Sequence, residues 1–130
     1  MTINPLTIFY AKILGILILV VAISFLINPK RAQKVLEEAK ESEYLLLLDG
    51  SLALLFGSFI ILTHNMWDNA LAKAVSAIGW LSFAIGIFEL VFPKKLVLKT
   101  YGKLPKVAYV ATPLLFVGVG LFLLYKAFYV

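Results

Sequence analysis

Two apolar runs separated by a short polar turn lie between Leu45 and Phe92. The turn reads His64-Asn65-Met66-Trp67-Asp68-Asn69. Each run is about 20 residues long, which is the length of helix that crosses the roughly 30 Å hydrocarbon core of a bilayer. This stretch therefore predicts a helical hairpin within a membrane.

The composition extends this prediction to the whole chain. With 62% hydrophobic and 15% charged residues, 130 residues carry more apolar surface than a globule of this size can bury. We expect an all-α, polytopic membrane protein that forms one transmembrane domain over residues 1–130, with four transmembrane helices arranged as two helical hairpins. The expected spans are 5–27, 44–63, 71–92 and 107–129.

Two short segments, one near 30–42 and one near 94–104, connect these spans on one side. The first places Ala32, Val35, Leu36 and Ala39 on one helical face opposite charged residues. Such amphipathic segments lie in the membrane interface, although the first could also be a solvated helical loop. Cations that could contact anionic lipid headgroups are Lys30, Arg31, Lys34, Lys94, Lys95 and Lys99.

The distribution of positive charge predicts the orientation. Nine of the twelve lysines and arginines lie in the two stretches between spans at residues 28–43 and 93–106, and basic loops stay in the cytoplasm. We therefore expect a bacterial cytoplasmic (inner) membrane protein with both termini and the 64–69 turn in the periplasm. The net charge of +5 then indicates anionic headgroups as partners, and a nucleic acid is not expected.

Catalytic and cofactor motifs are not found in the sequence. The chain contains no cysteine, which excludes disulfides, thiolate nucleophiles and thiolate metal sites. No nucleophile–base pair, ligand cluster or phosphate-binding loop is recognisable. We expect neither an enzyme nor a bound cofactor or metal.

Two carboxylates, Asp49 and Glu89, lie about one turn inside the ends of the two hairpin helices. A hairpin would bring them to the same depth. Carboxylates inside a membrane are costly and commonly functional. One interpretation is a pair of structural ion pairs with Arg31, Lys94 or Lys95, and the alternative is a binding site for a proton or a cation.

The turn offers a second group of candidates, His64, Asn65, Trp67 and Asp68. His64 is the only histidine, and Asp68 could join it as a metal ligand; a haem would also have to use His64. The same residue types cap helices and anchor chains at the membrane interface. We expect a structural role for this turn.

Small residues predict how the helices pack. Gly50, Ala53 and Gly57 share one side of the second span, and Ser82 and Gly86 form a small-xxx-small pair in the third. Such faces let membrane helices approach closely. Since four helices need not cover all of them, we expect a homo-oligomer or a partner membrane protein.

The two halves of the chain also look alike. Ala11-Lys12 before an apolar run ending at Pro29-Lys30 has a counterpart about sixty residues later in Ala72-Lys73 and Pro93-Lys94. Four-helix membrane proteins with two basic loops share this pattern without duplication, so both explanations stay open. A duplication would relate the halves by an axis along the membrane normal.

The sequence resembles a family of small, uncharacterised bacterial membrane proteins with four helices. The resemblance is carried by residues 13–36, 52–62, the His64-Asn65-Met66-Trp67 turn and 78–93. It departs after the turn, where Asp68-Asn69-Ala70 stands in place of a further tryptophan. The resemblance implies four helices, and it implies no activity and no site residue.

Two functions remain open from the sequence. The first is a non-enzymatic membrane module whose basic segments bind anionic lipid or a partner protein. The alternative is a small homo-oligomeric transporter or channel that uses Asp49 and Glu89 as an intramembrane site for a proton or cation. Solvation of these two carboxylates would discriminate between them.

Overall fold

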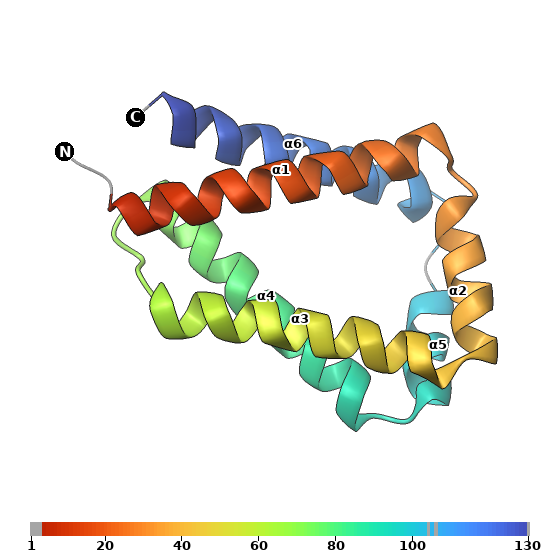
Figure 1. The fold of residues 1–130 in the computed structure, drawn as a ribbon. Coiled ribbons are helices and arrows are strands. Elements are labelled where there is room, and N and C mark those ends of the chain that lie inside the picture. Colours follow the sequence, from red (N-terminus) through yellow and green to blue (C-terminus); the bar gives the residue numbers. More distant parts are fainter. Residues whose placement is uncertain (1–3, 104, 106, 130) are drawn as a thin grey trace.

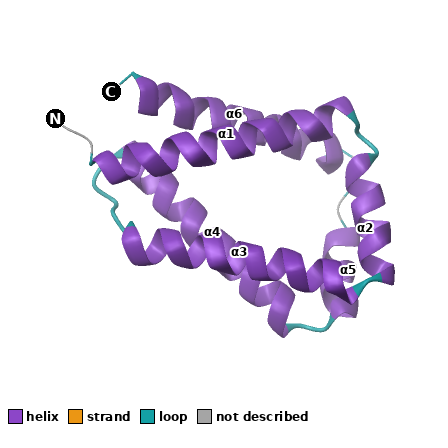
Figure 2. Ribbon diagram, viewed as in Figure 1, coloured by secondary structure: helices purple, strands orange, loops and turns teal. Residues whose placement is uncertain are grey.

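A computed structural model describes residues 4–103, 105 and 107–129, and these residues form six helices and no strand (Figures 1 and 2). The helices are α1 (Pro5–Ile27), α2 (Arg31–Glu41), α3 (Glu43–Thr63), α4 (Ala70–Val91), α5 (Lys94–Gly102) and α6 (Ala108–Phe128). The four long helices, α1, α3, α4 and α6, are long and apolar enough to cross a membrane. Their bounds agree with the expected spans to within two residues.

Local capping signals explain several of these bounds. Pro5 occupies the first turn of α1, where the Asn4 side chain accepts a hydrogen bond from the backbone N–H of Leu6 at 2.8 Å. Asn69 caps α4 in the same way, by accepting from the backbone N–H of Ala72 at 2.9 Å. Gly102 is the last residue of α5, and Lys103 follows it as the C-cap. No described glycine has a positive φ, so Gly102 does not form a left-handed cap.

The long helices pack as two pairs, α3 with α4 and α1 with α6 (Figure 1). The first pair is the hairpin expected between Leu45 and Phe92. The second pair joins the two ends of the chain, so the expected second hairpin of consecutive helices is not formed. Contacts between the two pairs are sparse.

Glycines provide the close contact within each pair. A Cβ placed on Gly57 would lie 2.4 Å from the backbone nitrogen of Phe83, and one on Gly86 would lie 2.6 Å from that of Leu54. In the other pair, a Cβ on Gly15 would lie 2.7 Å from Cγ of Leu124. The small faces are thus used inside the chain, and they no longer argue for a homo-oligomer.

Different structural elements lie at the two ends of the molecule. Helices α2 and α5 contact each other at one end, while the start of α1, the end of α6 and the α3–α4 turn gather at the other (Figure 1).

Exchanging the two halves of the chain maps α1 onto α4, α2 onto α5 and α3 onto α6. This exchange converts the α3–α4 pair into the α1–α6 pair. A duplicated chain whose halves are related by a two-fold axis would require this relation.

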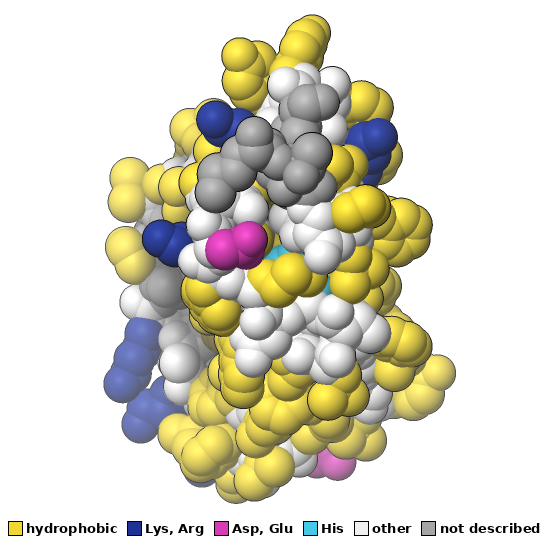
Figure 3. All heavy atoms as spheres, turned by 90° about the vertical axis from the view of Figure 1, so that its left-hand side faces the viewer, with side chains coloured by type: hydrophobic (Ala, Val, Ile, Leu, Met, Phe, Trp, Pro, Cys, Tyr) yellow, Lys and Arg dark blue, Asp and Glu magenta, His cyan; other side chains and the backbone are white. Residues whose placement is uncertain are grey.

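The outer surface is apolar along the long helices. Only 22% to 28% of the residues in the four candidate spans are buried within the chain. Hydrophobic side chains also dominate the outline in Figure 3, which views the end with the termini. Water is a poor solvent for such a surface, and a multi-pass membrane protein follows.

Candidate functional site

Glu89 is a buried carboxylate near the C-terminal end of α4. It is 5% exposed, and its Oε1 accepts a hydrogen bond from the hydroxyl of Tyr101 at 2.8 Å. Its Oε2 is buried and has no hydrogen-bond partner among the described residues. An unsatisfied buried acceptor is unfavourable, and such a group commonly marks a site for a ligand, ion or proton.

Tyr101 reaches Glu89 because Pro93 ends α4 and α5 turns the chain back toward the bundle. Burial, and then the hydrogen bond to Glu89, raise the pKa of Tyr101 above its usual range. The phenol therefore stays protonated and donates. Tyr101 does not stand out in the sequence as a site residue; its one signal there is a hydroxyl one short helix beyond a membrane carboxylate.

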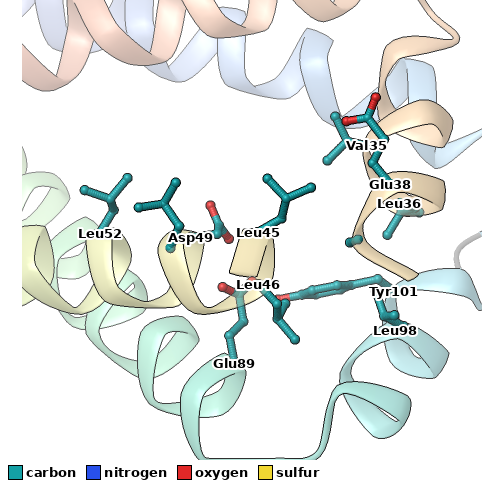
Figure 4. Close-up of a pocket in the computed structure, with 12 residues that line it drawn as sticks. Val35, Leu36, Glu38, Leu45, Leu46, Asp49, Leu52, Glu89, Leu98 and Tyr101 are labelled. Atoms are coloured by element: carbon teal, nitrogen blue, oxygen red, sulfur yellow. The ribbon is translucent and has the colours of Figure 1, made fainter. Parts of the chain in front are cut away.

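Asp49 faces Glu89 from α3. Figure 4 shows its carboxylate directed toward that of Glu89, with the ring of Tyr101 beside the pair. The neighbouring Gly50 permits this proximity, since a Cβ at that position would lie 3.2 Å from Cβ of Glu89. The expected placement of the two carboxylates at one depth is therefore found.

The cations expected beside these carboxylates bind elsewhere. Arg31 donates a hydrogen bond to the hydroxyl of Ser24, and the Lys94 ammonium donates to the carbonyl oxygen of Lys40 at 2.8 Å. Ion pairs of Arg31 or Lys94 with these carboxylates, one of the two interpretations of the sequence, are thus not found among the described residues. Two carboxylates in close proximity, without these cations, favour the uptake of positive charge.

A cavity of about 360 Å³ opens in front of the pair, and we call it the acidic pocket. It is bounded by α2, α3, α5 and the end of α4, and apart from Asp49, Glu89, Glu38 and Tyr101 its described lining is hydrocarbon. Glu38 lies at its edge with its carboxylate directed away from the pair (Figure 4). Within the described residues, no three acidic or histidine side chains gather closely enough to hold a metal ion.

The histidine of the turn is buried and contacts both α1 and α4. His64 is fully buried; its Nε2 lies 2.6 Å from Oγ1 of Thr7, and its Nδ1 lies 3.1 Å from Oγ of Ser76. Ser76 also donates to the carbonyl oxygen of Met66 at 2.8 Å. These contacts join α1 to the hairpin in a site closed to solvent. Nothing in the sequence pattern indicates Thr7 or Ser76 as partners of His64.

The rest of the turn is held by tryptophan contacts. Asn65 accepts hydrogen bonds from the indole N–H groups of Trp67, at 2.8 Å, and Trp80, at 3.4 Å. Asp68 is exposed whereas His64 is buried, and neither belongs to a group of three possible metal ligands among the described residues. The structural interpretation of the turn accounts for these contacts.

The candidate lipid contacts lie at the α2–α5 end. Lys30, Arg31, Lys34, Lys95 and Lys99 are exposed, whereas Lys94 is half-buried. Their position beside the ends of the long helices fits a membrane interface.

Comparisons with protein families, with characterised proteins and with solved structures find no match to the chain. The site is therefore interpreted from its own geometry.

Proposed function

We propose that this protein is a small membrane transporter that binds a proton or a cation at Asp49 and Glu89. The observation that carries the proposal is Oε2 of Glu89, a buried acceptor without a hydrogen-bond partner among the described residues, in a side chain that lines a cavity. A carboxylate retained in that position without an ion pair costs stability. Binding of positive charge would offset this cost.

The arrangement of the helices supports the same function. Two packed pairs with sparse contacts between them can move as bodies, and helix bundles that move against each other are a common basis of alternating access. The site would be reached from the α2–α5 end. By the distribution of positive charge, this end is proposed to face the cytoplasm of a bacterium.

Purified protein in liposomes tests the proposal. Vesicles loaded with a pH-sensitive dye would report proton movement when Na⁺, K⁺ or methylammonium is added outside. We expect flux above that of empty liposomes, and we expect it to be abolished by Asp49→Asn combined with Glu89→Gln. Glu41→Gln, which alters an exposed carboxylate of α2 outside the acidic pocket, is the matched control. Unchanged flux in the double variant would overturn the proposal.

A second candidate function is the lipid- or partner-binding module. It is supported by the exposed cations of α2 and α5 at one end of the molecule. Native mass spectrometry would test it by comparing retained phosphatidylglycerol with retained phosphatidylcholine. Replacing Lys30, Lys34, Lys95 and Lys99 by glutamine should remove the preference for the anionic lipid if the module function is correct.

A further inference from the structure

A second cavity adjoins the acidic pocket. It has a volume of about 280 Å³ and lies between α1, α2 and α6; we call it the apolar pocket. Val35, Leu36 and Tyr101 line both cavities. The two pockets are therefore neighbours that share one set of side chains as their boundary.

The apolar pocket offers a ligand almost no polar group. Among its described lining residues only Thr112 and Tyr101 carry hydroxyls, while Phe25, Pro113 and Phe116 contribute large hydrocarbon surfaces. The Tyr101 hydroxyl is already bound to Glu89. Tyr101 therefore lines both pockets while its hydroxyl is held at the carboxylate pair.

We infer that the ligand is an amphipathic organic ammonium ion whose charged head binds Asp49 and Glu89 and whose hydrocarbon body extends past Tyr101 into the apolar pocket. The inference rests on the proposed function and specifies its substrate class. An ammonium N–H can donate to Oε2 of Glu89, the acceptor that has no hydrogen-bond partner among the described residues. A body of hydrocarbon then matches the apolar lining beyond.

The chemistry of the lining disfavours an inorganic cation. Hard metal ions require several oxygen ligands, whereas the acidic pocket supplies two facing carboxylates within a mainly hydrocarbon surface. A neutral amphiphile would leave both carboxylates unpaired. An ammonium ion with an apolar body satisfies both surfaces together.

A series of amines measures the contribution of the apolar pocket. The full chain in lipid nanodiscs would be titrated calorimetrically with methylammonium, benzylamine, 4-phenylbutylamine and 4-phenylbutanol, with heats from empty nanodiscs subtracted. We expect affinity to rise about threefold for each methylene that enters the pocket. We also expect the alcohol to bind more weakly than the amine of the same length. Equal affinity for methylammonium and 4-phenylbutylamine would overturn the inference.

Filling the apolar pocket provides the second test. Thr112→Phe places a ring in the cavity, and it should weaken 4-phenylbutylamine binding about tenfold while leaving methylammonium unaffected. Ala111→Phe adds the same ring at an exposed position of α6 outside the pocket, and serves as the control. Ala32→Phe fills the pocket from α2 and decides the question if Thr112→Phe does not fold. Equal effects of the filling and control variants would overturn the inference.

The outcomes separate the two proposals. If Glu89→Gln abolishes the binding of every amine while length and pocket filling have no effect, the cation site stands and the apolar pocket is not part of it. If amine binding is unchanged in Asp49→Asn combined with Glu89→Gln, the cation site itself is wrong and the inference fails with it.

Discussion

The α3–α4 pair and the α1–α6 pair have the same architecture and differ in charge. Each pair has a close contact at glycine, and each contributes to a pocket beside α2. The pocket of the first pair contains Asp49 and Glu89, whereas the described lining of the other contains no charged side chain. The comparison shows that a pair of this kind packs without carboxylates.

This difference bears directly on what the two carboxylates do. If they were needed to hold helices together, the α1–α6 pair would need equivalents, and its described pocket lining has none. Glycine contacts supply the packing in both cases. This difference supports the proposal that the carboxylates of α3 and α4 serve in binding.

The largest expected effect on stability comes from a substitution at the glycine contacts that both helix pairs share. Gly57→Leu would force side-chain atoms into the backbone of Phe83, where even a Cβ would lie 2.4 Å from a nitrogen atom. We expect it to lower the free energy of unfolding by about 3 kcal/mol or more, or to prevent folding. Gly118 has no atom near its Cβ position, so Gly118→Ala should stabilise α6 slightly. Thermal unfolding in detergent would measure both, and equal melting temperatures would show that the helices are not in close contact at Gly57.

Adding a carboxylate to the apolar pocket and removing one from the acidic pocket tests the difference in charge between the two helix pairs. Phe25→Glu would place a carboxylate in the apolar pocket, and we expect a loss of about 2 to 3 kcal/mol. Glu89→Gln removes a buried charge while its amide oxygen can still accept from Tyr101, so stability should be unchanged or higher. The measurement is again the thermal transition, followed by tryptophan fluorescence. A comparable loss in both variants would mean that Glu89 is structural.

The third prediction concerns the connection between the pairs. His64→Ala would leave the buried hydroxyls of Thr7 and Ser76 without this partner, and we expect a loss of about 2 kcal/mol. Asn65→Ala changes an exposed residue of the same turn and should cost less. Hydrogen exchange at the start of α1 would increase in the His64 variant alone; similar exchange in the two variants would contradict the role given to His64.

The smallest expected effect depends on pH. The raised pKa of Tyr101 means that the folded chain retains a proton that the unfolded chain loses above about pH 10. Its contribution to stability is therefore present below that pH and declines as the pH rises further. Tyr101→Phe should lower stability by about 1 kcal/mol at pH 7, and the difference from the wild type should shrink by pH 11. A difference independent of pH would contradict this account.

The sequence predicted the elements that depend on local pattern. Apolar runs of spanning length indicated the four long helices, and the hairpin placed Asp49 beside Glu89. Each of these features requires only neighbouring residues or one tight turn. The order of residues along the chain is therefore enough to predict them.

Features that depend on distant residues were not predictable. Long helices that are apolar on all sides do not indicate which faces meet, so the pairing of α1 with α6 was missed. The bond between Thr7 and His64 joins residues 57 positions apart. One interpretation of the sequence paired Arg31 or Lys94 with these carboxylates, but Arg31 donates to Ser24 and Lys94 donates to the carbonyl oxygen of Lys40.

In the proposed transporter, the closed cluster of Thr7, His64 and Ser76 would have a kinetic consequence. It lies at the end of the molecule opposite the α2–α5 end, and it is fully buried. A ligand could reach the acidic pocket without disturbing it, but release on the far side would require α1 to separate from the hairpin and break these hydrogen bonds. Occupancy and turnover would then be limited by different barriers, so weakening the cluster would change the rate of crossing while leaving equilibrium binding intact.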